Sequence, residues 1–193
     1  MKRFSTTDLI IIAVMAALGL GTKQIVRPIV SLITVPLAIP GGAIAGGFYF
    51  IWLVLTKRLS PKLGSGTMFG ITQALVVMIL PFGSHGIFTL ITYSLPGIIV
   101  DLIDLLFRRQ NQTLACSITE GAIANFTGNL LVLLFIFQLE LLPTIFVSLL
   151  ALFTGNLGGI LAHYISKRVS KELSLTTFEE KDSSLEKDEP LTA

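Results

Sequence analysis

Long apolar segments separated by short basic segments constrain the fold of this chain more than any other feature. The apolar segments are about 17 to 25 residues long, the length that a helix needs to cross a hydrocarbon core of roughly 30 Å. They are continuous and do not alternate with polar residues, so membrane-spanning strands are excluded. Only 13% of the residues are charged, whereas a soluble domain has roughly 25%. The sequence therefore predicts an all-α membrane protein.

The apolar segments predict a bundle of six transmembrane helices. The first covers residues 8–21 and continues irregularly to residue 36, with a break at Gly21-Thr22. The other five cover residues 37–56, 65–81, 87–107, 114–137 and 143–166. A signal peptide is the alternative for the first segment, because Met1-Lys2-Arg3 precedes it, but no clear cleavage site follows.

Lysine and arginine residues predict the orientation of the bundle. Most of them lie before the first span and after the second, fourth and sixth spans. These residues are Lys2, Arg3, Lys57, Arg58, Lys62, Arg108, Arg109, Lys167, Arg168 and Lys171. These segments alternate along the chain, so they share one face of the membrane, and both termini are predicted to be cytoplasmic. The turn at residues 80–86 then lies outside. Residues 1–170 form the predicted transmembrane domain, and the polar segment 171–193 is predicted to be a disordered cytoplasmic tail.

Small residues recur at every fourth position in four of the predicted spans, a spacing that lets helix backbones approach closely. They are Ala13, Ala17 and Gly21 in the first span, Gly42 and Gly46 in the second, Gly66 and Gly70 in the third, and Gly155 and Gly159 in the sixth. Packing within the bundle explains any one of these motifs. Docking of a partner membrane subunit is the alternative, and the stripe on the first span is its best candidate.

The chain resembles the substrate-binding S component of an energy-coupling factor transporter, which is a type of ABC transporter. The resemblance rests on six spans in 193 residues with cytoplasmic ends, on Ala13-x-x-x-Ala17, and on the Lys-Leu-Gly-Ser-Gly-Thr sequence that begins at Lys62. It implies a multi-pass protein of a prokaryotic cell membrane that captures a vitamin, a vitamin precursor or a transition-metal ion. It also implies that Ala13 and Ala17, continued by Gly21, contact a transmembrane coupling subunit, and that two separate ATPase subunits hydrolyse ATP.

Polar residues at the outer ends of several spans predict a ligand pocket, because polar groups that face lipid are costly. Amides, hydroxyls and aromatic rings suit a small polar or heteroaromatic molecule, and Lys23 and Arg27 could attract an anionic group. The candidates are Lys23, Gln24, Arg27, Gln73, His85, Thr89, Tyr93, Asn125, Asn129 and Ser148. Interfacial anchoring remains the alternative for the two cations. Helix–helix hydrogen bonding remains open for the asparagines, as does simple surface exposure for His85.

Three acidic residues, Asp101, Asp104 and Glu120, are predicted to lie in the cytoplasmic half of the bundle. One interpretation is ion pairing with the basic residues of the cytoplasmic loops, namely Lys57, Lys62, Arg108 and Arg109. Acidic residues within the membrane are also candidates for proton relays. In that case the chain would be a self-sufficient proton-coupled secondary transporter.

The sequence predicts neither an enzyme nor a metal site. It contains no phosphate-binding loop of the Gly-x-x-x-x-Gly-Lys-Ser/Thr type, and the adjacent Ser84 and His85 do not form a nucleophile–base pair. Cys116 is the single cysteine, and His85 and His163 are predicted on opposite faces of the membrane. No cofactor is expected. The expected partners are a small-molecule substrate, the coupling subunit, two ATPase subunits and membrane lipid, and no nucleic acid.

Overall fold

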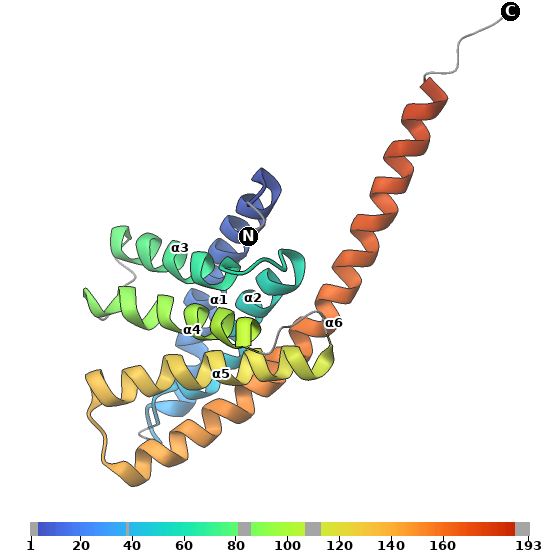
Figure 1. Cartoon of the computed structure of the whole chain (residues 1–193). Helices are drawn as coiled ribbons and strands as arrows, with labels where there is room; N and C mark the ends of the chain where they lie inside the picture. Colours follow the sequence, from blue (N-terminus) through green and yellow to red (C-terminus); the bar gives the residue numbers. More distant parts are fainter. Residues whose placement is uncertain (1–3, 38, 81–85, 107–112, 188–193) are drawn as a thin grey trace, which may run out of the picture.

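The computed structural model describes residues 4–37, 39–80, 86–106 and 113–187, and their side chains as far as residue 172. These residues form six α-helices and one π-helical turn (Figure 1). In chain order they are α1 Thr6–Thr34, α2 Gly41–Leu59, α3 Ser65–Ile79, α4 Phe88–Leu106, α5 Leu114–Val132, η1 Leu133–Phe137 and α6 Leu141–Lys187. The predicted all-α class is confirmed for the described part of the chain.

Four helical segments are long and apolar enough to cross a membrane by length and composition. They are Thr6–Thr34, Phe88–Leu106, Leu114–Phe137 and Leu141–Glu172. Helix α3 is a shorter apolar helix, and α2 carries Lys57 and Arg58 in its last turn. The chain is therefore a multi-pass helical membrane protein, while the count of six spans and the cytoplasmic termini stay predictions.

The predicted break after Gly21 is wrong, because α1 is one continuous helix of 29 residues. Its start is fixed by a capping box in which Ser5 accepts a hydrogen bond from the backbone of Asp8, and Asp8 accepts one from the backbone of Ser5 at 2.7 Å. A glycine in an apolar segment does not end the helix, since a break would leave backbone groups without partners in lipid. Lys23 and Arg27 consequently lie one turn apart on a helix.

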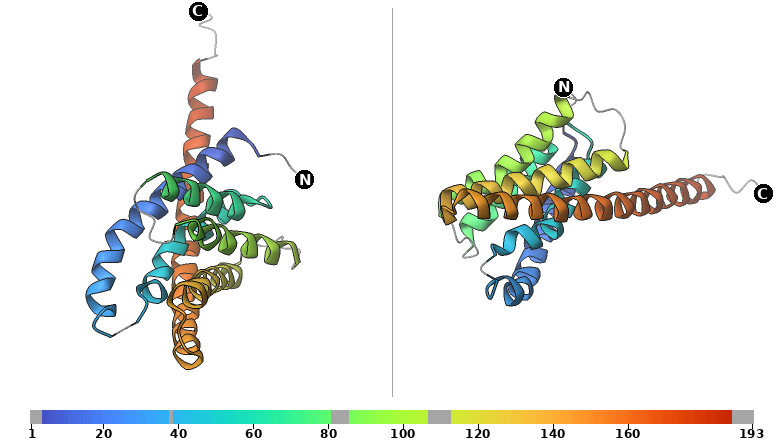
Figure 2. Two further views of the ribbon diagram at one scale, coloured as in Figure 1. Left: turned by 90° about the vertical axis from the view of Figure 1, so that its left-hand side faces the viewer. Right: turned by 90° about the horizontal axis from the view of Figure 1, so that it is seen from below.

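The most extensive helix–helix packing joins α5 with α6, α2 with α6, α3 with α4 and α1 with α2. Figure 1 shows α3 beside α4, and α5 beside α6. Helix α6 projects beyond the rest of the bundle (Figures 1 and 2) and continues without a break through residue 170 to Lys187. The division into a domain at residues 1–170 and a disordered tail at 171–193 stays a prediction.

Glycines bring two of these helix pairs into close contact. A Cβ atom added to Gly121 of α5 would lie 2.8 Å from the backbone nitrogen of Gly159 in α6. One added to Gly66 of α3 would lie 3.0 Å from the carbonyl oxygen of Gly97 in α4. The glycine motifs of α3 and α6 thus serve packing inside the bundle.

Substitution of Gly121 by valine is expected to destabilise the protein by about 1–3 kcal/mol, because the added side chain forces α5 and α6 apart. The matched control is Gly21→Ala on α1, where an added Cβ atom meets nothing within 4 Å. Thermal unfolding of the purified protein in detergent micelles measures both variants. Equal unfolding midpoints for the two would contradict the assigned packing.

Candidate functional site

A cavity of about 570 Å³ lies among the helices. It is formed by the second half of α1, the first half of α2, the middle of α3, the start of α4 and the end of α5 with η1. Its polar lining residues are Lys23, Arg27, Ser31, Thr34, Tyr49, Gln73, Thr92, Tyr93, Asn125 and Asn129. Phe50, Phe69 and Phe137 add apolar rings. The volume is in the range of small-molecule sites, as is a mainly apolar wall with a few polar groups.

Lys23 of α1 lies in an aromatic corner of this cavity. Its Nζ donates a hydrogen bond to the hydroxyl of Tyr93 on α4. The same atom is 4.2 Å from the ring centroid of Tyr93 and 5.7 Å from that of Tyr49 on α2, both within cation–π range. Arg27, one helical turn further along α1, lines the same cavity. Three helices therefore hold a positive charge at one side of the cavity.

Two asparagines of α5 form another part of the wall. Asn125 Nδ2 donates to the carbonyl of Ala151 at 2.8 Å and to Thr154 Oγ1 at 2.9 Å, both on α6. Asn129 Nδ2 donates to Asn125 Oδ1 at 2.6 Å and to the carbonyl of Gly42 on α2 at 3.2 Å. These amides join α2, α5 and α6 and also line the cavity. Ligand binding and helix–helix hydrogen bonding, the two interpretations of these asparagines, are therefore compatible.

The structure brings six of the ten candidate ligand residues to the cavity: Lys23, Arg27, Gln73, Tyr93, Asn125 and Asn129. Three others lie elsewhere: Gln24 is on the exposed face of α1, and Thr89 and Ser148 are buried away from the lining. His85 lies outside the described residues.

Tyr49 is the main cavity residue that the sequence analysis missed. It follows Gly46 by three positions, and residues three or four apart share a helix face. A Cβ atom added to Gly46 would collide with the side chain of Asn125, so this face of α2 meets the cavity wall of α5. The three-residue spacing from Gly46 is thus the sequence signal that could have placed Tyr49 on this face.

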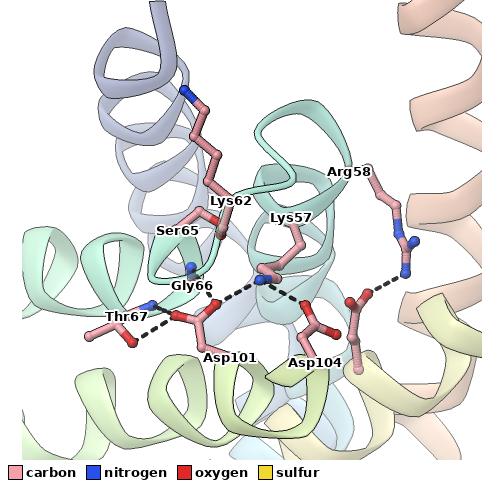
Figure 3. A network of polar contacts seen from close by, with 9 residues as sticks. Lys57, Arg58, Lys62, Ser65, Gly66, Thr67, Asp101 and Asp104 are labelled. Carbon is pink, nitrogen blue, oxygen red and sulfur yellow. Dashed lines mark hydrogen bonds and ion pairs between the residues drawn. The ribbon is translucent and has the colours of Figure 1, made fainter. Parts of the chain in front are cut away.

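An ion-pair network occupies the opposite ends of the same helices (Figure 3). Lys57 Nζ at the end of α2 contacts Asp101 and Asp104 of α4, each at 2.7 Å. Asp101 also accepts hydrogen bonds from the backbone of Thr67 at 2.7 Å and of Gly66 at 3.3 Å. The residue before α3 is Gly64, which has no side chain to cap the helix. Asp101 therefore caps α3 from a neighbouring helix, where a carboxylate also complements the helix dipole.

Two further acidic residues are paired at this end. Arg58 contacts Glu120 at 2.6 Å, with side chains only 4% and 2% exposed. Asp8 pairs with Lys62 and accepts a hydrogen bond from Ser60 at 2.8 Å. The predicted pairing with a basic residue is confirmed for Lys57, which contacts Asp101 and Asp104, whereas Glu120 pairs with Arg58. Arg108 and Arg109 lie outside the described residues. The sequence analysis did not predict the ion pair of Asp8 with Lys62. It also missed the capping pattern Ser5-x-x-Asp8, which marks the start of α1.

A comparison with protein families places the first two thirds of the chain in a defined group. The family model described as "ABC-type cobalt transport system, permease component" matches residues 7–127. The matched segment includes α1 to α4 and most of α5, and so contains every polar cavity residue except Asn129. The chain has no significant match among curated proteins or solved structures.

Proposed function

We propose that this chain, which belongs to the family of permease components of ABC-type cobalt transport systems, captures a vitamin or vitamin-precursor-like small molecule for ATP-driven uptake. The family makes it a membrane transport component of an ABC-type system and fits the S component of an energy-coupling factor transporter. Such a component carries its substrate and does not transform it. ATP hydrolysis belongs to partner ATPase subunits, and the proposed location is a prokaryotic cell membrane.

The lining of the cavity is the observation that carries this proposal. Aromatic rings and amides side by side suit a small heteroaromatic or polar organic molecule. Transport of a cobalt ion is the competing function, because the family description names that metal. A cobalt ion needs several histidine, cysteine or carboxylate ligands. The described lining instead presents Lys23 and Arg27, whose charges repel a metal cation.

We assign docking of the transmembrane coupling subunit to the stripe of Ala13, Ala17 and Gly21 on α1. All three residues are exposed, and an added Cβ atom on Gly21 meets nothing within 4 Å. The small residues of the other three motifs face partners inside the bundle. An exposed apolar stripe without large side chains permits close helix contact in the membrane. The coupling subunit would connect the chain to two ATPase subunits.

The alternative of a proton-coupled transporter depends on a membrane acid that is available for protonation. Asp101, Asp104 and Glu120 each form an ion pair with a basic residue of α2. Their contacts therefore support a structural role at the end of the bundle away from the cavity.

Addition of the correct vitamin or precursor to the purified protein is expected to raise its unfolding temperature by roughly 5 °C or more at saturating concentration. Tyr93→Leu should weaken this binding about tenfold, whereas Thr89→Val, one turn earlier on α4 and away from the lining, should leave it unchanged. A thermal-shift screen that also includes Co²⁺ measures the effect. Stabilisation by Co²⁺ alone would support the competing function.

Uptake provides the second arm of this test. Proteoliposomes that contain the chain with its coupling and ATPase subunits should accumulate the bound compound only when ATP is supplied. Uptake by the chain alone, driven by an imposed proton gradient, would contradict the proposal and favour a secondary transporter.

A further inference from the structure

We infer that the occupant of the cavity is an organic oxyanion, whose carboxylate or phosphate group is held between Lys23 and Arg27. This inference rests on the proposed function of the cavity as a substrate site, and it specifies the chemical class of that substrate.

The first observation is an uncompensated positive charge. Lys23 and Arg27 lie four residues apart on α1 and line one cavity. Like charges at this spacing destabilise a helix. Among the described residues, no carboxylate lines the cavity and no ion pair includes either cation.

The second observation is the contrast with the other end of the same bundle. There Lys57, Arg58 and Lys62 each contact a carboxylate. Lys23 is half-buried and Arg27 is exposed, so the solvation argument applies to the Lys23 ammonium, whose partial removal from water is unfavourable without an anionic partner. The chain thus pairs its basic residues with carboxylates at one end of the bundle. At the other end, Lys23 and Arg27 face the cavity, where a bound anion would supply the negative charge.

The third observation is that Lys23 is already oriented. Lys23 is held by the hydroxyl of Tyr93 and by the rings of Tyr49 and Tyr93. Because the Tyr93 oxygen accepts from Lys23, its own hydrogen remains available to donate to a ligand. The guanidinium of Arg27 adds a planar pair of donors that matches carboxylate and phosphate oxygens. The neighbouring Phe50 and Phe69 would contact the apolar body of the ligand.

Matched pairs of charged and neutral compounds test this inference. Suitable probes are pyridine-3-carboxylate with pyridine-3-carboxamide, and thiamine monophosphate with thiamine. Affinities are measured by titration calorimetry on the purified chain in phosphatidylcholine nanodiscs. The wild-type protein should bind the anionic member of at least one pair about tenfold more tightly or better.

Charge removal should abolish this preference. Lys23→Met and Arg27→Gln are each expected to reduce the preference for the anion about tenfold, while Lys23→Arg retains most of it. The control is Arg168→Gln, which removes an exposed arginine of α6 outside the cavity and should change nothing. Unchanged unfolding temperatures without ligand establish that the variants fold.

The possible failures are distinguishable. Equal or tighter binding of the neutral compounds, or a preference that survives in the Lys23→Met/Arg27→Gln double variant, overturns the inference and leaves the capture function intact. Displacement of the anionic probe by added phosphatidylglycerol also overturns it, because the subsite then belongs to a lipid headgroup. Failure of every compound to bind, together with absence of ATP-dependent uptake, contradicts the capture function and the inference together.

Discussion

Replacement of Asp101 by alanine is expected to lower the free energy of unfolding by about 3–5 kcal/mol, the range for removal of one partner of a buried ion pair. The change removes one of the two carboxylates that face Lys57 and the acceptor for the backbone N–H groups of Gly66 and Thr67 at the start of α3. The side chains of Lys57 and Asp101 are only 4% and 7% exposed, so water does not replace these contacts. Unfolding in mixed micelles with increasing dodecyl sulfate measures the loss.

Two variants show whether the position of Asp101, and not a general loss of charge, causes this effect. Asp104→Ala also removes a carboxylate from Lys57, but the Asp104 side chain is 16% exposed and does not cap α3. We expect it to cost about 1–2 kcal/mol. Asp101→Asn keeps an acceptor for α3 and should fall between the two alanine variants. Equal losses for Asp101→Ala and Asp104→Ala would contradict the capping role.

Substitution of Ala17 by tryptophan is expected to reduce ATP-dependent uptake about tenfold or more while leaving ligand binding within about twofold of wild type. Ala17 is exposed at the centre of the α1 stripe, so a bulky ring there does not disturb the bundle. It would separate two helix backbones that must approach closely in the complex. Co-purification of the coupling subunit and uptake by reconstituted proteoliposomes measure the effect.

The control for this prediction is Leu18→Trp on the same helix. Leu18 is 44% exposed, and it lies about 100° around the helix from Ala17, so the same added ring points away from the stripe. We expect normal co-purification and uptake for this variant. Intact co-purification with Ala17→Trp, or an equal loss with Leu18→Trp, would show that the coupling subunit docks elsewhere.

The sequence predicted features that depend on local composition. Continuous apolar segments predicted helices because a chain in lipid must satisfy its backbone hydrogen bonds within each segment. The predicted start of the third span at Ser65 and the predicted end of the fifth at Phe137 agree with the structure. The family resemblance agrees with the match over residues 7–127. Six of the ten candidate ligand residues line one cavity, because polar side chains at one depth of a bundle have few other places to lie.

Other features depended on how the helices are rotated and paired. Spacing shows which residues share a face of one helix, but it does not show which face meets a neighbour. Spacing therefore named the stripe on α1 only as the best docking candidate, whereas the structure leaves its three small residues exposed and places the glycines of the other three motifs against neighbouring helices. Local composition thus determined the membrane class and the helices of this protein. The tertiary structure alone decided which side chains meet: Tyr49 enters the cavity, Thr89 does not, and Asp101 caps α3.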